Sequence, residues 1–205
     1  MTVLSFTITF YSPFRVGAAS ARDGITATID HNDPLPADHL KGVMRAAAGQ
    51  LLGDPDHPAI GEVFGSPRTP SPWSWSHATP EQATQEQAAP KQPWPQPIRR
   101  HRVAIDEQTH SAKKDQLVLA EQIWVPTASF TITRLGAIQE STEGTHIALL
   151  RCAAAGVHGL GGWRRRGLGW VGITPADTAV TTDDIKVIQT LRTLTTANQA
   201  KEASR

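Results

Sequence analysis

The chain has 205 residues, enough to bury one ordinary hydrophobic core, and we interpret residues 1–205 as a single domain. Its formal net charge is only +1, which excludes a uniformly basic, histone-like binder, so any attraction to nucleic acid must come from locally clustered charge. The single cysteine, Cys152, excludes an internal disulfide and a zinc site built on several thiolates.

The first half of the chain predicts a strand, a long loop and a helix. Residues 3–11 alternate polar with β-branched and aromatic residues, which is typical of a strand. Residues 15–33 lack helical periodicity and predict an irregular loop, with a short strand near residues 25–29. Residues 36–52 carry apolar side chains at helical spacing, with Asp38 as the expected N-cap and Gly53 just past the end.

Residues 66–97 change abruptly to Pro, Gln, Ser, Thr and Ala, with almost no aliphatic side chains. Such a segment buries too little apolar surface to repay its ordering, so we interpret it as an inserted flexible loop. Trp73, Trp75 and Trp94 are unusual there, and we favour packing or a partner contact over base stacking.

The second half predicts alternating strands and helices. Residues 106–116 are polar and predict a protruding hairpin. We expect a short basic strand over residues 99–105 and a strand interrupted by Pro126 over residues 123–135. A helix over residues 142–157, with Cys152 in the core, should precede a strand over residues 170–173. A short helix over residues 183–194 and a frayed tail over residues 195–205 should end the chain.

The most informative stretch is a glycine-rich basic loop, residues 159–169, which holds five glycines around Arg164, Arg165 and Arg166. Glycines let backbone N–H groups approach an anion, and guanidinium groups match phosphate oxygens. The loop follows a helix and precedes a strand, the reverse of nucleotide-cofactor loops, which favours a polyanion. The plain alternative is a flexible connection with solvated arginines.

Several short motifs occur together in order: Leu35-Pro36 with Leu40-Lys41-Gly42 and Arg45; Val63-Phe64-Gly65; Ile105-Asp106 with Thr109 and Ala112; Glu121 and Phe130; and Gly161-Gly162 through Arg166-Gly167-Leu168-Gly169. This combination resembles the RAMP superfamily of CRISPR-associated proteins, and is most similar to the backbone subunits of type III interference complexes. The resemblance implies an α+β, ferredoxin-like and RRM-related fold in which the hairpin is a thumb.

The resemblance also implies that the first helix, the glycine-rich loop and the thumb hold guide RNA through its backbone and shape. The residues that we assign to RNA binding are Lys41, Arg45, Arg100, Arg102, Lys113, Lys114, His158, Gly161, Gly162, Arg164, Arg165, Arg166 and Gly167.

Several backbone subunits of this kind cut target RNA with an aspartate on the loop between the first strand and the first helix. Asp30 matches the family pattern best, while Asp23 and Asp33 lie on the same loop and remain alternatives. Asp30 would help to hold a Mg²⁺ ion that positions the phosphate, and the RNA 2′-OH would be the nucleophile. The plain alternative is that these aspartates form turns.

The sequence therefore predicts a cytoplasmic, guide-RNA-binding backbone subunit of a CRISPR ribonucleoprotein effector, with target RNA, other effector subunits and copies of itself as partners and no membrane association. Two other functions stay open. One is a guide-processing endoribonuclease that uses a histidine as general base, and the other is a non-catalytic capping subunit. The candidate histidines are His31, His39, His101, His110 and His158.

Overall fold

The fold is that of a computed structural model, which describes residues 1–18, 24–81 and 94–202, and side chains as far as residue 193. A five-stranded antiparallel sheet holds β1 (Val3–Phe10) between β6 (Thr127–Arg134) and β7 (Val171–Pro175). Two short strands, β2 (Trp73–Trp75) and β3 (Thr79–Glu81), pair with the other edge of β6. Helix α1 (Ala37–Leu52) follows β1 and α3 (Glu140–Ala155) follows β6, which is the ferredoxin-like order and confirms the predicted α+β fold.

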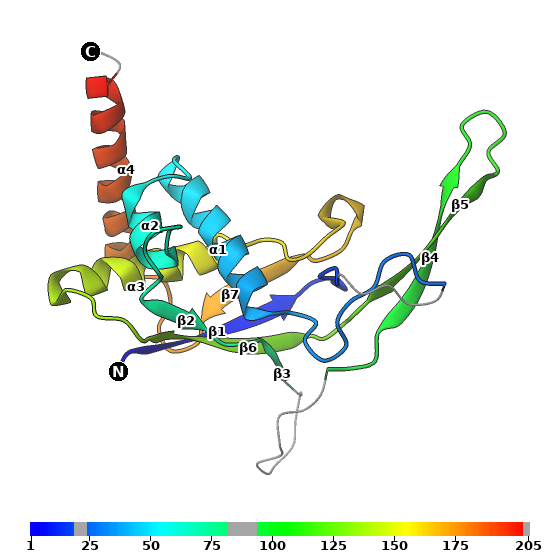
Figure 1. The fold of residues 1–205 in the computed structure, drawn as a ribbon, viewed down its shortest axis with the longest axis horizontal. Helices are drawn as coiled ribbons and strands as arrows, with labels where there is room; N and C mark the ends of the chain where they lie inside the picture. Colours follow the sequence, from blue (N-terminus) through cyan, green and yellow to red (C-terminus); the bar gives the residue numbers. More distant parts are fainter. Residues whose placement is uncertain (19–23, 82–93, 203–205) are drawn as a thin grey trace, which may run out of the picture.

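One face of the main sheet carries the core. Alternate residues of β1 are buried, and Phe6 and Ile8 are fully enclosed against α1 and α3. Figure 1 shows α1, α2 (Pro58–Phe64) and α3 together on one side of this sheet. The last helix, α4 (Thr182–Glu202), packs on α3 and α1. It continues past the predicted end at Leu194, so the prediction of a frayed tail is wrong over residues 195–202, which are helical.

The predicted hairpin is confirmed and forms a separate two-stranded sheet, β4 (Ile98–Ile105) with β5 (Ala112–Gln122). Figure 1 shows it extending away from the main sheet as an arm. Its base is fixed, because backbone hydrogen bonds join Ile123 to Phe14 in both directions, at 2.8 and 2.9 Å. The predicted strand at residues 25–29 is reduced to isolated bridge residues, Ile25 and Ala27, of which Ala27 pairs in parallel with Ala120 of β5.

Three details differ from the sequence-based expectations. The N-cap of α1 is Pro36, without a side-chain cap, and Asp38 lies in the first turn, where its charge favours the helix dipole. The prediction of an inserted flexible loop is wrong at β2 and β3, because Trp73 and Trp75 are 3% and 8% exposed and bury these strands in the core, and Trp94 packs against Phe14. Helix α2 was not predicted. Residues 82–93 lie outside the described part of the chain.

Candidate nucleic-acid interface

The glycine-rich loop crosses the start of the β1–α1 connection at very short range. A Cβ atom on Gly161 would lie 2.0 Å from the carbonyl oxygen of Arg15, and one on Gly169 would lie 1.9 Å from that of Leu160. Both glycines also have positive φ angles, 71° and 73°. Glycine is therefore required at these two positions by contacts inside the protein.

Several N–H groups of this loop are already used by the fold. Gly161 donates to Nε2 of His39, Gly162 to the carbonyl oxygen of Arg15 and Gly169 to that of Pro13, at 2.9, 2.9 and 2.8 Å. The predicted anion cradle of glycine N–H groups is therefore wrong for Gly161 and Gly162, because each N–H points at a protein acceptor. Gly167 has a φ of 80° and open space around it.

A cluster of arginines surrounds Trp163, at the start of the 3-10 turn η1 (Arg164–Arg166). The guanidinium carbons of Arg15, Arg102 and Arg166 lie 4.7, 4.8 and 5.8 Å from the centroid of its ring. These distances are those of cation–π contacts. The three arginines come from the β1–α1 connection, from β4 of the arm and from the loop itself. We call this group the Trp163 cluster.

Arg15 is the member that the sequence analysis missed. It is 9% exposed, Nη2 donates to the carbonyl oxygen of Thr28 at 3.2 Å, and Nε is buried with no hydrogen-bond partner. Burial lowers the pKa of Arg15, and the nearby charge of Glu121 opposes that change. No motif surrounds Arg15 in the sequence, so only its contact with the glycine loop reveals it.

Lys41 and Arg45 lie in a different place from the Trp163 cluster. Nζ of Lys41 is 5.3 Å from the centroid of the Trp75 ring, and Nη1 of Arg45 donates to the carbonyl oxygen of Gly65 at 2.8 Å. Both line a groove of about 500 Å³ between α1 and residues 65–71. The structure therefore divides the predicted cations between two surfaces.

The other predicted RNA-binding residues are exposed around the arm and the loop. Arg100 lies two residues before Arg102 on β4 and so shares its face of the arm. Lys113 and Lys114 lie on β5 near the tip, Arg164 and Arg165 are exposed in η1, and His158 is exposed where its carbonyl accepts from Val171.

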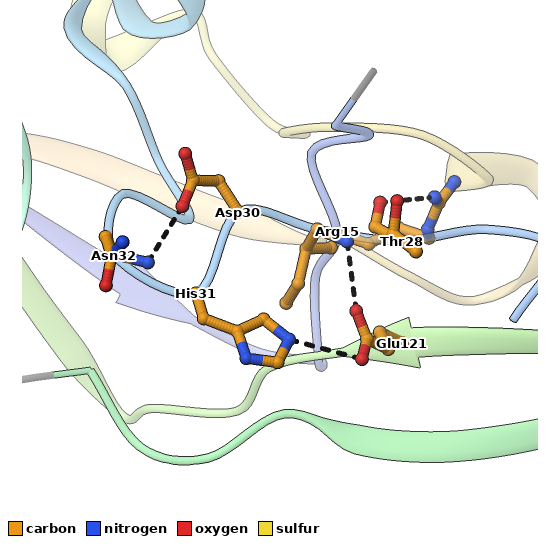
Figure 2. Close-up of polar contacts among 7 residues, drawn as sticks. Arg15, Thr28, Asp30, His31, Asn32 and Glu121 are labelled. Carbon is orange, nitrogen blue, oxygen red and sulfur yellow. Dashed lines mark hydrogen bonds and ion pairs between the residues drawn. The ribbon is translucent and has the colours of Figure 1, made fainter. Parts of the chain in front are cut away.

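The Asp30 loop is anchored from below by a buried carboxylate. Glu121, 1% exposed, accepts from the N–H of Ile29 and pairs with Nε2 of His31, each at 3.2 Å. Figure 2 shows His31 directed toward Glu121, while Asp30 projects from the other side of the loop. The two neighbours of Asp30 are thus fixed, and its own side chain is left at the surface.

The carboxylate of Asp30 also shapes its own turn. Its Oδ1 accepts from the N–H groups of Asn32 and Asp33, at 2.9 and 3.4 Å. Asp33 is engaged elsewhere, since its Oδ2 lies 2.6 Å from Nδ1 of His77. Asp23 lies outside the described residues. Of the described candidates, Asp30 is the one that presents a carboxylate outward beside an otherwise fixed loop.

Comparison with known proteins places this geometry in a family. The family model of the RAMP superfamily matches residues 7–172, which include both loops and the arm. The chain belongs to the RAMP superfamily. A search of curated proteins found no match.

Two solved structures have a fold similar to that of this chain over most of its length. One is a chain of the type III-B Cmr-beta complex bound to cognate target RNA, with a TM-score of 0.59 and 14% identity, and the other belongs to the same complex in its apo state, with 0.61 and 13%. Each match covers 85% of this chain and 97% of the other.

Two of the motifs behind the RAMP resemblance have structural roles here. Oδ1 of Asp106 accepts from the N–H groups of Gln108 and Thr109 and from the Thr109 hydroxyl, which closes the tip of the arm. These hydrogen bonds lower the pKa of Asp106. Gly65, with a φ of 81°, lets the chain turn close to Ser71. Neither role requires RNA.

Proposed function

We propose that this chain is an RNA-binding subunit of a type III CRISPR ribonucleoprotein effector, and that it holds the guide RNA by its phosphates. The observation that carries the proposal is the Trp163 cluster. Three guanidinium groups within 6 Å of one indole repel one another, and Arg15 keeps a buried Nε without a partner. A polyanion bound at the cluster would relieve the repulsion, and membership of the RAMP superfamily supports RNA as that polyanion.

The arm adds a geometric argument. Arg102 belongs to β4, so the cluster ties the arm to the body at the point where a bound phosphate would lie. One structural neighbour comes from a complex bound to cognate target RNA, which favours a subunit of a similar assembly for this chain. Target RNA, other effector subunits and copies of itself are the partners that this function would require, in the cytoplasm.

Salt dependence of RNA binding tests the proposal. Replacing Arg15, Arg102 and Arg166 with Ala should weaken binding and reduce the slope of log affinity against log salt by roughly 0.7 for each phosphate of single-stranded RNA that the variant no longer neutralises. Lys186→Ala, on α4 and paired with Asp183, is the matched control and should leave the slope unchanged. An unaltered slope in the triple variant would contradict the proposal.

Cleavage of target RNA is the second part of the proposal, and the outward position of Asp30 favours it. In the described part of the chain, no three His, Cys, Asp or Glu side chains group into a metal site. Magnesium often takes only one or two protein carboxylates beside phosphates and water, so Asp30 fits as a single ligand. When bound, Mg²⁺ would supply stabilisation of the leaving oxygen. Asp30 itself would help to hold the ion, and the RNA 2′-OH would be the nucleophile.

The turn contacts of Asp30 decide how cleavage must be tested. Asp30→Asn keeps an oxygen for the N–H groups of Asn32 and Asp33 but removes the charge, whereas Asp30→Ala removes both. If the charge is catalytic, both variants should bind RNA normally and fail to cut in the assembled, Mg²⁺-containing complex. Cleavage by Asp30→Asn would assign Asp30 to the turn alone and reject its catalytic role.

The guide-processing alternative is less favoured. His39, the histidine in contact with the glycine-rich loop, uses Nε2 to accept from Gly161, so that nitrogen is not available as a base. Cutting of precursor RNA by the purified chain without added metal would revive this alternative.

A further inference from the structure

Two large aromatic side chains are exposed together at one end of the main sheet. Tyr11 and Trp170 are 67% and 59% exposed, and the N–H of Tyr11 donates to the carbonyl oxygen of Trp170 at 2.8 Å. They continue the pairing of β1 with β7 beyond the Phe10–Val171 pair. Residues paired across antiparallel strands point to the same face, so both aromatic rings share one face.

That face is the one opposite the helices. Along β1 the buried residues alternate with Ser5, Thr7 and Thr9, which are half-buried on the other face, and Tyr11 has the same parity. Gly172 confirms the direction of Tyr11, because a Cβ added there would meet the Tyr11 hydroxyl at 3.0 Å. We call this surface the open face.

The rest of the open face is lined by hydroxyl groups. Ser129 and Thr131 of β6 alternate with buried neighbours in the same way as the β1 residues. Together with Ser5 and Thr7 they line a cavity of about 850 Å³, which His77 and Asp33 also border. These hydroxyl groups offer hydrogen bonds to ribose and phosphate, and Glu81 and Trp94 border the same cavity.

The aromatic pair is continuous with the cationic loop. Trp170 directly follows the glycine-rich loop, and its N–H donates to Oγ of Ser12 at 2.9 Å, which fixes the start of β7. The exposed side chains of Arg164 to Arg166 precede it by a few residues. Single exposed aromatics are common on protein surfaces, but a pair beside clustered arginines has the composition of a single-strand binding platform.

We propose that the open face binds single-stranded RNA, with Tyr11 and Trp170 stacking on bases and the Ser and Thr hydroxyls contacting the sugar–phosphate backbone. The inference rests on the proposed function and extends it, since it adds a base-contacting surface to a site that was argued from phosphates alone. Every base has an aromatic face, so this contact would not select a sequence.

Abasic RNA separates stacking from phosphate binding. The full chain would be titrated with a labelled single-stranded RNA of mixed sequence and with the same strand carrying abasic sites. Trp170→Ala and Tyr11→Ala should each weaken binding of the normal strand about 5- to 150-fold per base unstacked, with little change for the abasic strand. The salt slope should stay as in the unmodified protein, and Trp170→Phe should restore most of the affinity.

Ile185→Ala is the matched control, because Ile185 is 48% exposed on α4, within the helical layer. It should change neither strand's affinity. Thermal unfolding of each variant checks its fold, and the comparison of normal with abasic RNA on the unmodified protein needs no variant. Equal affinity for the two strands would overturn the inference.

Two results distinguish this inference from the proposed function. If the triple arginine variant reduces the salt slope while Trp170→Ala binds RNA normally, the open face is not an RNA surface and the proposed function stands. If the unmodified chain binds neither strand, both fall. A loss of self-association by Trp170→Ala with unchanged RNA affinity would identify a contact between copies of this chain, which also overturns the inference.

Discussion

The glycine-rich loop and the Asp30 loop are both held in place by contacts within the protein, but the two kinds of contact differ. In the first, glycines let one backbone pack on another, so that Gly161 and Gly162 donate to His39 and Arg15. In the second, the buried side chain of Glu121 fixes the residues on either side of Asp30. One loop is fixed by backbone contact and the other by a carboxylate.

This difference indicates which groups of each loop can contact a ligand. In each loop several backbone N–H groups are occupied within the protein, which leaves the projecting side chains as the main groups that can meet a ligand. The glycine-rich loop projects arginines that gather with others around Trp163, whereas the Asp30 loop projects one carboxylate. Several converging positive charges indicate a polyanion as the ligand, whereas a lone carboxylate indicates its ligand much less specifically.

The largest effect should come from a side chain at the close backbone contact. Gly161→Ala places Cβ 2.0 Å from the Arg15 carbonyl at a φ of 71°, so we expect a loss of about 3 kcal/mol or more in the free energy of unfolding. Gly144→Ala, inside α3 with open space around it, should instead stabilise by about 0.5–1 kcal/mol. Urea denaturation measures both, and a mild effect at Gly161 would show that the loop yields easily.

Removing the carboxylate anchor should cost somewhat less. Glu121→Leu leaves the buried N–H of Ile29 and the ring of His31 without this acceptor, and we expect a loss of about 2–3 kcal/mol. The exposed Glu107→Leu should stay within about 0.5 kcal/mol. Hydrogen exchange of the Ile29 amide gives a local reading, and retained protection there in Glu121→Leu would contradict the anchoring role.

Acid should weaken the glycine-rich loop through His39. Burial, and then the charge of Arg164, lower the pKa of His39 in the folded protein. Since the unfolded chain binds the proton more readily, stability should fall as pH decreases below about 6.5, the ordinary histidine value. We call this fall in stability the acid limb. His39→Gln should make the acid limb shallower, at a cost of about 1 kcal/mol in the free energy of unfolding at neutral pH. Burial also lowers the pKa of His146, so part of the acid limb should remain in His39→Gln.

Arg164→Gln sharpens the same measurement. Removing this charge should leave the acid limb shallower than in the unmodified protein, because one cause of the lowered His39 pKa is removed. Thermal melts between pH 5 and pH 8 would compare the three proteins. An acid limb identical in all of them would exclude His39 as a contributor.

The smallest effect should be local, at the tip of the arm. Asp106 closes its turn with the same two backbone contacts that Asp30 makes, to the second and third residues along. Hydrogen bonding lowers the pKa of Asp106, so its contribution is present above the ordinary aspartate value and disappears as pH falls through the lowered one. Asp106→Ala should speed amide exchange at Gln108 and Thr109 without changing global stability.

Much of the fold could be predicted from local patterns. Period-two alternation identified β1 and β6, and helical spacing with Gly53 at a left-handed C-cap identified α1. The short strands β2 and β3 were missed because three residues carry no periodicity, and Trp73 and Trp75 were the signal that could have revealed buried structure in a polar segment.

The sequence by itself determined the longer strands and helices, where the glycine-rich loop lies and that it carries arginines, because hydrogen-bond periodicity and turn chemistry are local. Only the tertiary structure decided which cations meet. Arg15, Arg102 and Trp163 are far apart in the chain and converge because β1, the arm and the loop before β7 are joined by backbone pairing. The same packing sent Lys41 and Arg45 to a separate groove, which residue type and spacing could not reveal.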